Sequence, residues 1–152
     1  MSNDDVSVTD LGYPGMRSQS AVRRTRTGTV AETEQTRRVL VLEDSVLVAL
    51  ALEAALADHG FEAIVAGSLA AAEERLGRVP PVAAVLDLHL PDGNSLALAE
   101  RLDAQGCKVA LCSGMDAETV PAGYEFAAHF RKPVAADELA RWALSAASSP
   151  GT

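Results

Sequence analysis

The feature of this sequence that most limits its fold is an alternation of short apolar runs with helix-like segments. The runs that read as strands are Val39–Leu42, Phe61–Ala66, Val82–Leu86, Cys107–Cys112 and Phe126–Phe130. The segments that read as helices are Ser45–Asp58, Ser68–Leu76, Ser95–Ala104 and Ala135–Ala147. This alternation, with short connections, requires parallel strands joined by crossover helices. We therefore predict an α/β fold with a doubly wound, five-stranded parallel sheet and helices on both faces.

The segment between the last two runs departs from this alternation. Residues 116–123 contain Pro121 and Gly123, which leave room for at most a short helix. We therefore expect the fourth helix of the fold to be short or degenerate.

Composition divides the 152 residues into two parts. Residues 1–36 are rich in Ser, Thr, Arg and Gly and show no helical or strand period, so they are predicted to be a disordered tail. Residues 37–147 are predicted to form one folded domain, followed by a frayed C-terminus at 148–152. The basic stretch Arg17–Arg26 has two interpretations, a solvated tail or an arm for a nucleic acid or an acidic partner.

The formal net charge is −8. Residues 1–37 hold five acids and five bases, so this charge belongs to the domain. An acidic surface argues against broad binding of nucleic acid or anionic membranes.

The two cysteines are Cys107 and Cys112, five residues apart on a predicted strand. This spacing points them to opposite faces of the sheet, so we expect two buried thiols, as is typical of a reducing compartment. No apolar run reaches the length of about 18 residues that a membrane span needs, and the first residues lack a signal-peptide pattern. A soluble, cytoplasmic protein without membrane contact is the prediction.

Polar residues follow the predicted strands at the edge where such sheets bind ligands. Glu43 and Asp44 follow the first strand, Asp87 the third, Ser113 the fourth and Lys132 the fifth. Three neighbouring carboxylates repel one another unless a cation offsets them, and Mg²⁺ is the usual choice beside a phosphate. Three carboxylates, Mg²⁺ and the lysine sum to zero charge. The sequence therefore predicts a site that can accept a phosphoryl group.

The residues at these strand ends carry a resemblance to the receiver domain of bacterial two-component response regulators. The matching stretches are Val39–Asp44, Leu86–Gly93, Leu111–Gly114 and Arg131–Pro133, in the order of the family, and the resemblance covers residues 38–147. It implies the flavodoxin-like (βα)5 receiver fold. We expect a stand-alone receiver, because no DNA-binding or catalytic module fits the remaining residues. Such a domain is no enzyme beyond catalysing its own phosphorylation and dephosphorylation.

The resemblance assigns a role to each acidic residue of the site. Asp87 resembles the aspartate that accepts the phosphoryl group. Glu43, Asp44 and Asp87 resemble the ligands that hold Mg²⁺, with the backbone carbonyl of His89 as a further ligand.

Other residues resemble the family's phosphate-binding and switch positions. Ser113 and Lys132 match the residues that bind the acyl phosphate, and Pro133 matches a proline that follows a cis bond. His129 stands where the family has a switch aromatic, so it either fills that space or acts as a switch with pH sensitivity. His89 and Met115 occupy positions that tune how long the phosphoryl group is retained.

The implied function is phosphoryl transfer from a phosphohistidine on a histidine kinase or histidine phosphotransfer protein. The phosphorylation state would control contacts with an unidentified downstream protein in a phosphorelay, and a homodimer stays open. One rival is a pseudo-receiver that binds proteins independently of phosphorylation. A cobalamin-binding domain is disfavoured because Gly93 comes six residues after Asp87 rather than five. A haloacid-dehalogenase-like phosphatase would need an aspartate where His89 stands.

The first predicted helix is unusually apolar, with 11 of its 14 residues hydrophobic from Ser45 to Asp58. This is more than one buried face requires. The helix is either a well-packed, Ala-rich element or a partner face, since kinases of the family dock beside it. Leu52 and Leu56 are the positions where a glutamate would test this docking.

Overall fold

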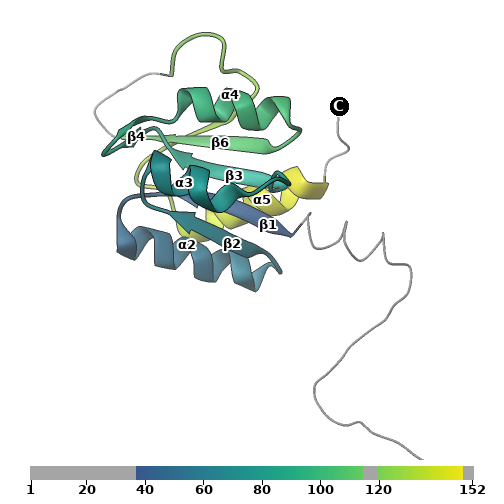
Figure 1. Cartoon of the computed structure of the whole chain (residues 1–152). Helices are drawn as coiled ribbons and strands as arrows, with labels where there is room; N and C mark the ends of the chain where they lie inside the picture. The colour runs from purple at the N-terminus through teal and green to yellow at the C-terminus, as the bar shows by residue number, and fades with distance from the viewer. Residues whose placement is uncertain (1–36, 115–119, 149–152) are drawn as a thin grey trace, which may run out of the picture. The chain divides into compact units, whose positions relative to one another are not determined.

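The computed structural model describes residues 37–114 and 120–148, which contain a five-stranded parallel sheet (Figure 1). The strands in spatial order are β2 (Glu62–Ala66), β1 (Arg38–Leu42), β3 (Ala83–Asp87), β6 (Lys108–Ser113) and β7 (Ala128–Arg131). The helices are α2 (Val46–Asp58), α3 (Leu69–Leu76), α4 (Leu96–Ala104) and α5 (Ala136–Ser148). The predicted fold is therefore confirmed. The predicted tail at 1–36 and residues 149–152 lie outside the described residues.

Side chains of the sheet alternate between two apolar cores, because successive residues of a strand point to opposite faces. On β1, Leu40 and Leu42 pack with the buried side chains of α3 and α4. Val39 and Val41 pack on the other face with those of α2 and α5. The central strands are buried on both faces, which explains their continuous apolar runs.

The two cysteines lie on opposite faces, as the spacing predicts. Cys107 belongs to the α3 and α4 core and Cys112 to the α2 and α5 core, and both thiols are free and buried. Burial raises the pKa of each thiol to about 12, with Asp103 adding to the effect at Cys107.

Two connections at the edge of the sheet differ from a simple alternation. After β3 the chain forms a small antiparallel hairpin, β4 (His89–Leu90) and β5 (Gly93–Asn94), which the sequence did not predict. Between β6 and β7, residues 120–127 form turns and contain no helix, while 115–119 lie outside the described residues. Phe126, expected in the last strand, belongs to these turns. No helix in the described ranges is both long and apolar enough to cross a membrane.

The outer face of α2 remains apolar in the folded domain. Val46, Leu47 and Leu50 are 70%, 79% and 55% exposed. By contrast, Leu52 and Leu56 are buried in the core, so the choice of these two positions as docking probes was wrong. A glutamate there would place a charge in the core and test stability instead.

Candidate functional site

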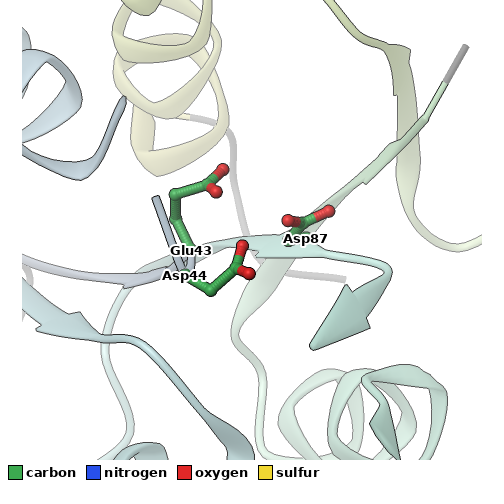
Figure 2. Close-up of side chains that lie close together, drawn as sticks. All are labelled: Glu43, Asp44 and Asp87. Carbon is green, nitrogen blue, oxygen red and sulfur yellow. The ribbon is translucent and has the colours of Figure 1, made fainter. Parts of the chain in front are cut away.

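Three carboxylates meet where β1 and β3 end. The two strands are paired in parallel with Leu42 opposite Leu86, so the residues that follow leave the sheet at the same edge. One carboxylate oxygen from each of Glu43, Asp44 and Asp87 lies within 4.8 Å of the other two (Figure 2). The predicted convergence of these residues is therefore what the structure shows.

Lys132 supplies the positive charge at the centre of this group. Its ammonium donates to Oε1 of Glu43 and to Oδ2 of Asp87, both at 3.0 Å. Both carboxylates are mostly buried, while the lysine side chain is 30% exposed. Burial alone would lower the pKa of Lys132, but these two hydrogen bonds raise it above its ordinary value. The ammonium of Lys132 therefore stays positively charged between the two acids. Its single charge offsets only part of their negative charge.

Backbone contacts fix where the Glu43 carboxylate points. Its Oε2 accepts from the backbone N–H of Ser45 at 3.0 Å, which leaves Oε1 for the lysine. The backbone N–H of Glu43 donates to the carbonyl of Ala66 at 2.9 Å, at the end of β2. The same Ser45 caps α2 by accepting from Val48.

The chemistry of the donor set fits a hard divalent cation. Glu43, Asp44 and Asp87 offer oxygen atoms alone, and one lysine offsets one of their three charges. Mg²⁺ prefers oxygen ligands and usually retains several waters, so a half-open group with Asp44 exposed suits it. The resemblance implies the backbone carbonyl of His89 as a fourth ligand. His89 is the first residue of β4, and its side chain is exposed.

The residues predicted to bind and sense phosphate lie on β6 and β7. The Ser113 carbonyl accepts from the backbone N–H of Lys132 at 2.8 Å, which keeps the two residues side by side. The peptide bond between Lys132 and Pro133 is cis, as the resemblance implies. Met115 lies outside the described residues.

His129 is exposed rather than filling a buried space. Its Nε2 lies 3.0 Å from the backbone carbonyl of Tyr124, in the turns before β7. The Tyr124 hydroxyl in turn donates to Glu100 on α4. No sequence motif marks Tyr124, which lies in the turns before β7 and contacts His129 only through the folded chain.

A cavity of about 340 Å³ borders the charged group. Glu43, Asp87 and Lys132 lie at one part of its wall, and apolar side chains such as Leu52 of α2 and Leu139 of α5 line the rest. Apolar walls keep water from screening the charges, so electrostatic interactions inside are stronger than at a free surface.

Solved structures, including those of response regulator receiver domains, are similar to this chain over most of its length. A CheY-like receiver domain from Methylobacillus flagellatus is 25% identical, with a TM-score of 0.62, covering 73% of this chain and 98% of that one. SdrG from Sphingomonas melonis Fr1 is 26% identical, with a TM-score of 0.62, covering 76% and 98%. The receiver domain of the Francisella response regulator 1452 shares the fold at 20% identity and a TM-score of 0.63, covering 74% and 97%.

A relative among characterised proteins matches a shorter part of the chain. Protein-glutamate methylesterase/protein-glutamine glutaminase 1 of Anaeromyxobacter dehalogenans (strain 2CP-C) is 35% identical over 79 residues. The match covers 51% of this chain and 23% of that protein, so the chain spans about a quarter of its relative. No family model matches the chain.

Proposed function

Most of the described chain is a CheY-like response regulator receiver domain, and from this premise we propose that it accepts a phosphoryl group on Asp87. The observation that carries the proposal is the contact of Lys132 with both Glu43 and Asp87, within a group of three carboxylates. The phosphodonor in this proposal is a phosphohistidine on a histidine kinase or phosphotransfer protein. In this proposal the domain signals through protein contacts and catalyses only its own phosphorylation and dephosphorylation.

In the proposed reaction a carboxylate oxygen of Asp87 attacks the phosphorus of the phosphohistidine. A P–O bond forms as the P–N bond breaks, and its electron pair stays on the imidazole. Lys132 lies 3.0 Å from Asp87 Oδ2 and can donate to the arriving phosphoryl oxygens. Mg²⁺ bound by Glu43 and Asp44 with Asp87 would supply further positive charge for this transfer.

The competing proposal is a pseudo-receiver that binds a partner without phosphorylation. The geometry favours the phosphoacceptor because each acidic residue and the lysine lie together at one edge. A pseudo-receiver has no need to keep three carboxylates within 4.8 Å of one another, since their repulsion destabilises the fold.

Incubation with Mg²⁺ and a small acyl phosphate, followed by mass measurement of the intact protein, tests the proposal. We expect the mass of one phosphoryl group on the wild type and none on Asp87→Ala. Asp58→Ala is the matched control. Asp58 is an exposed aspartate at the C-terminal end of α2, away from the carboxyl ends of β1 and β3 where the site lies. No added mass on the wild type, or added mass on Asp87→Ala, would favour the pseudo-receiver.

We also propose that the phosphodonor protein contacts the exposed apolar face of α2. Leu47 and Leu50 lie on this face, which begins directly after the acidic pair and so adjoins the site. Exposed apolar patches rimmed by polar groups commonly mark protein contacts.

Glutamate at Leu47 or Leu50 should slow phosphotransfer from the partner while leaving labelling by the small acyl phosphate unchanged. Leu144→Glu is the matched control, since Leu144 is an exposed leucine on α5. Equal transfer rates in all three variants and the wild type would discard the contact.

A further inference from the structure

Asp92 connects the β4–β5 hairpin to the start of α3. Its Oδ1 accepts from the backbone N–H of Leu69 at 2.9 Å, and its Oδ2 accepts from that of Ala70 at 3.1 Å. The two oxygens of one carboxylate thus satisfy two of the amides that a helix leaves unpaired at its N-terminus. These hydrogen bonds also hold the pKa of Asp92 below its usual range.

The helix has a local cap and does not depend on Asp92 for one. Ser68 accepts from the backbone N–H of Ala71 at 3.1 Å, which is the usual N-cap interaction. Asp92 is 23 residues beyond Leu69 and comes from the turn of another element. Its hydrogen bonds therefore hold the hairpin as much as they hold the helix.

The fit between hairpin and helix is close at the neighbouring residue. Gly93 has a φ of +142°, and a Cβ placed there would lie 3.1 Å from Cδ1 of Leu69. A Cβ at this position would require Leu69 Cδ1 to shift by a few tenths of an ångström, and side chains rarely adopt this φ, so glycine suits the close approach of the hairpin to α3.

The residues just before α3 contact the segment that carries the acidic pair. The Ala66 carbonyl accepts from Glu43 N–H, and a Cβ on Gly67 would lie 3.8 Å from the Glu43 carbonyl. The residues before α3 therefore pack against the backbone of Glu43. The segment after β3 is thus held by the first residues of α3, and the segment after β1 by the two residues that end β2 and lead into α3.

We propose that Asp92 is a positioning residue that sets the Mg²⁺ affinity of the site by holding the β4–β5 hairpin against α3. The hairpin begins two residues after Asp87 and includes His89, the residue whose carbonyl is the predicted fourth ligand. Releasing the hairpin would let this segment move relative to Glu43. The inference rests on the proposed function, since it assumes that the carboxylates bind Mg²⁺.

Calorimetric titration of Mg²⁺ into the unphosphorylated protein tests this role without any phosphotransfer. We expect Asp92→Ala to raise the Kd by about tenfold, the lower end for substitutions that orient metal ligands. Asp92→Asn keeps one oxygen acceptor and should give an intermediate Kd. Amide hydrogen exchange of residues 88–94 should be faster in Asp92→Ala than in the wild type.

Ser68→Ala is the matched control, because it removes a hydrogen bond from the same helix end but leaves the hairpin attached. Its Kd should equal that of the wild type. Equal Kd values for wild type and Asp92→Ala would overturn the positioning role and leave the proposed function intact, as would an effect of Ser68→Ala as large as that of Asp92→Ala. If Asp92→Asn raised the Kd as much as Asp92→Ala, the loss of Mg²⁺ affinity would come from the missing negative charge. That result would also overturn the positioning role of Asp92. A wild type that binds no Mg²⁺ would overturn both proposals.

Discussion

The two sides of the candidate site differ in their interactions. On one side charged side chains bond to each other, and on the other the contacts involve backbone groups. On the metal side, which comprises Glu43, Asp44, Asp87 and Lys132, the lysine bonds to two acids at 3.0 Å. On the switch side, which comprises Ser113, His129 and Tyr124, Ser113 meets Lys132 through its backbone, and His129 bonds to the carbonyl of Tyr124. The charged groups of the metal side thus already contact one another in this structure, whereas the residues of the switch side contact backbone groups and α4 instead.

This difference has an electrostatic reason. The buried acids of the metal side repel one another, so they need a permanent partner, and Lys132 provides one. A serine and an exposed histidine carry no such requirement. We therefore expect substitutions on the metal side to alter the resting protein, and those on the switch side to alter its response.

The largest effect is expected for Lys132→Met. Without the ammonium, Glu43 and Asp87 remain mostly buried beside each other and lose their positive partner. The free energy of unfolding in the absence of Mg²⁺ should fall by about 2 kcal/mol, less than for a fully buried pair because Lys132 is partly exposed. Mg²⁺ should restore more stability to this variant than to the wild type.

Urea denaturation with and without Mg²⁺ measures both changes. Arg131→Met serves as the control, since Arg131 is the adjacent exposed cation on β7. An unchanged free energy of unfolding for Lys132→Met would show that the metal side does not depend on the lysine, and the comparison between the two sides would fail.

The metal side was also the part of the molecule that could be predicted from the sequence. Parallel strands end at one edge, so residues directly after each apolar run had to converge there whatever the details of packing. The same argument placed Ser113 and Lys132 at that edge, and the structure adds that they share a backbone hydrogen bond.

What the sequence could not show depends on tertiary contacts between distant segments. In α2 nearly every residue is apolar, so periodicity could not separate Leu52, which is buried, from Leu50, which is exposed. The two-residue strands of the β4–β5 hairpin are too short to give a period-2 signal. The contact of Asp92 with α3 likewise spans 23 residues and belongs to no local motif.

Ser113→Ala should leave the resting protein nearly unchanged and remove its response. We expect the free energy of unfolding to change by about 0.5 kcal/mol or less, as for a partly exposed side chain with no structural role. Phosphorylation on Asp87 should then fail to alter amide exchange in residues 120–127, although the phosphoryl group is still accepted.

Hydrogen exchange with mass spectrometry, before and after labelling with a small acyl phosphate, measures this response. A wild-type response retained in Ser113→Ala would show that the serine does not sense the phosphoryl group. A large loss of resting stability would place it among the assembled contacts instead.

His129→Ala is expected to have an effect confined to the turns before β7. It removes the hydrogen bond to the Tyr124 carbonyl, which is worth about 1 kcal/mol at an exposed site. Amide exchange of residues 122–127 should be faster, while that of β1 and β3 should not change. Tyr124→Phe removes the bond to Glu100 and should affect the same segment from its other side. Faster exchange in β1 would show that the switch side supports the metal side, contrary to the comparison.

The smallest effect concerns pH and the fixing of the hairpin on the metal side. The amides of Leu69 and Ala70 lower the pKa of Asp92, so the folded state favours the ionised carboxylate more than the unfolded state does. The stabilisation by Asp92 is therefore complete above the ordinary aspartate pKa of about 4 and is lost as the pH falls through the lower, folded-state value. The difference in unfolding free energy between wild type and Asp92→Asn should be constant near neutral pH and shrink in acid, as measured by urea denaturation over a pH series.

Comparing the two proteins isolates this carboxylate, because the other acids titrate in both. If this free-energy difference grew on acidification, the protonated Asp92 carboxyl would be the form that holds the hairpin. The metal side would then depend less on ionised groups than we propose.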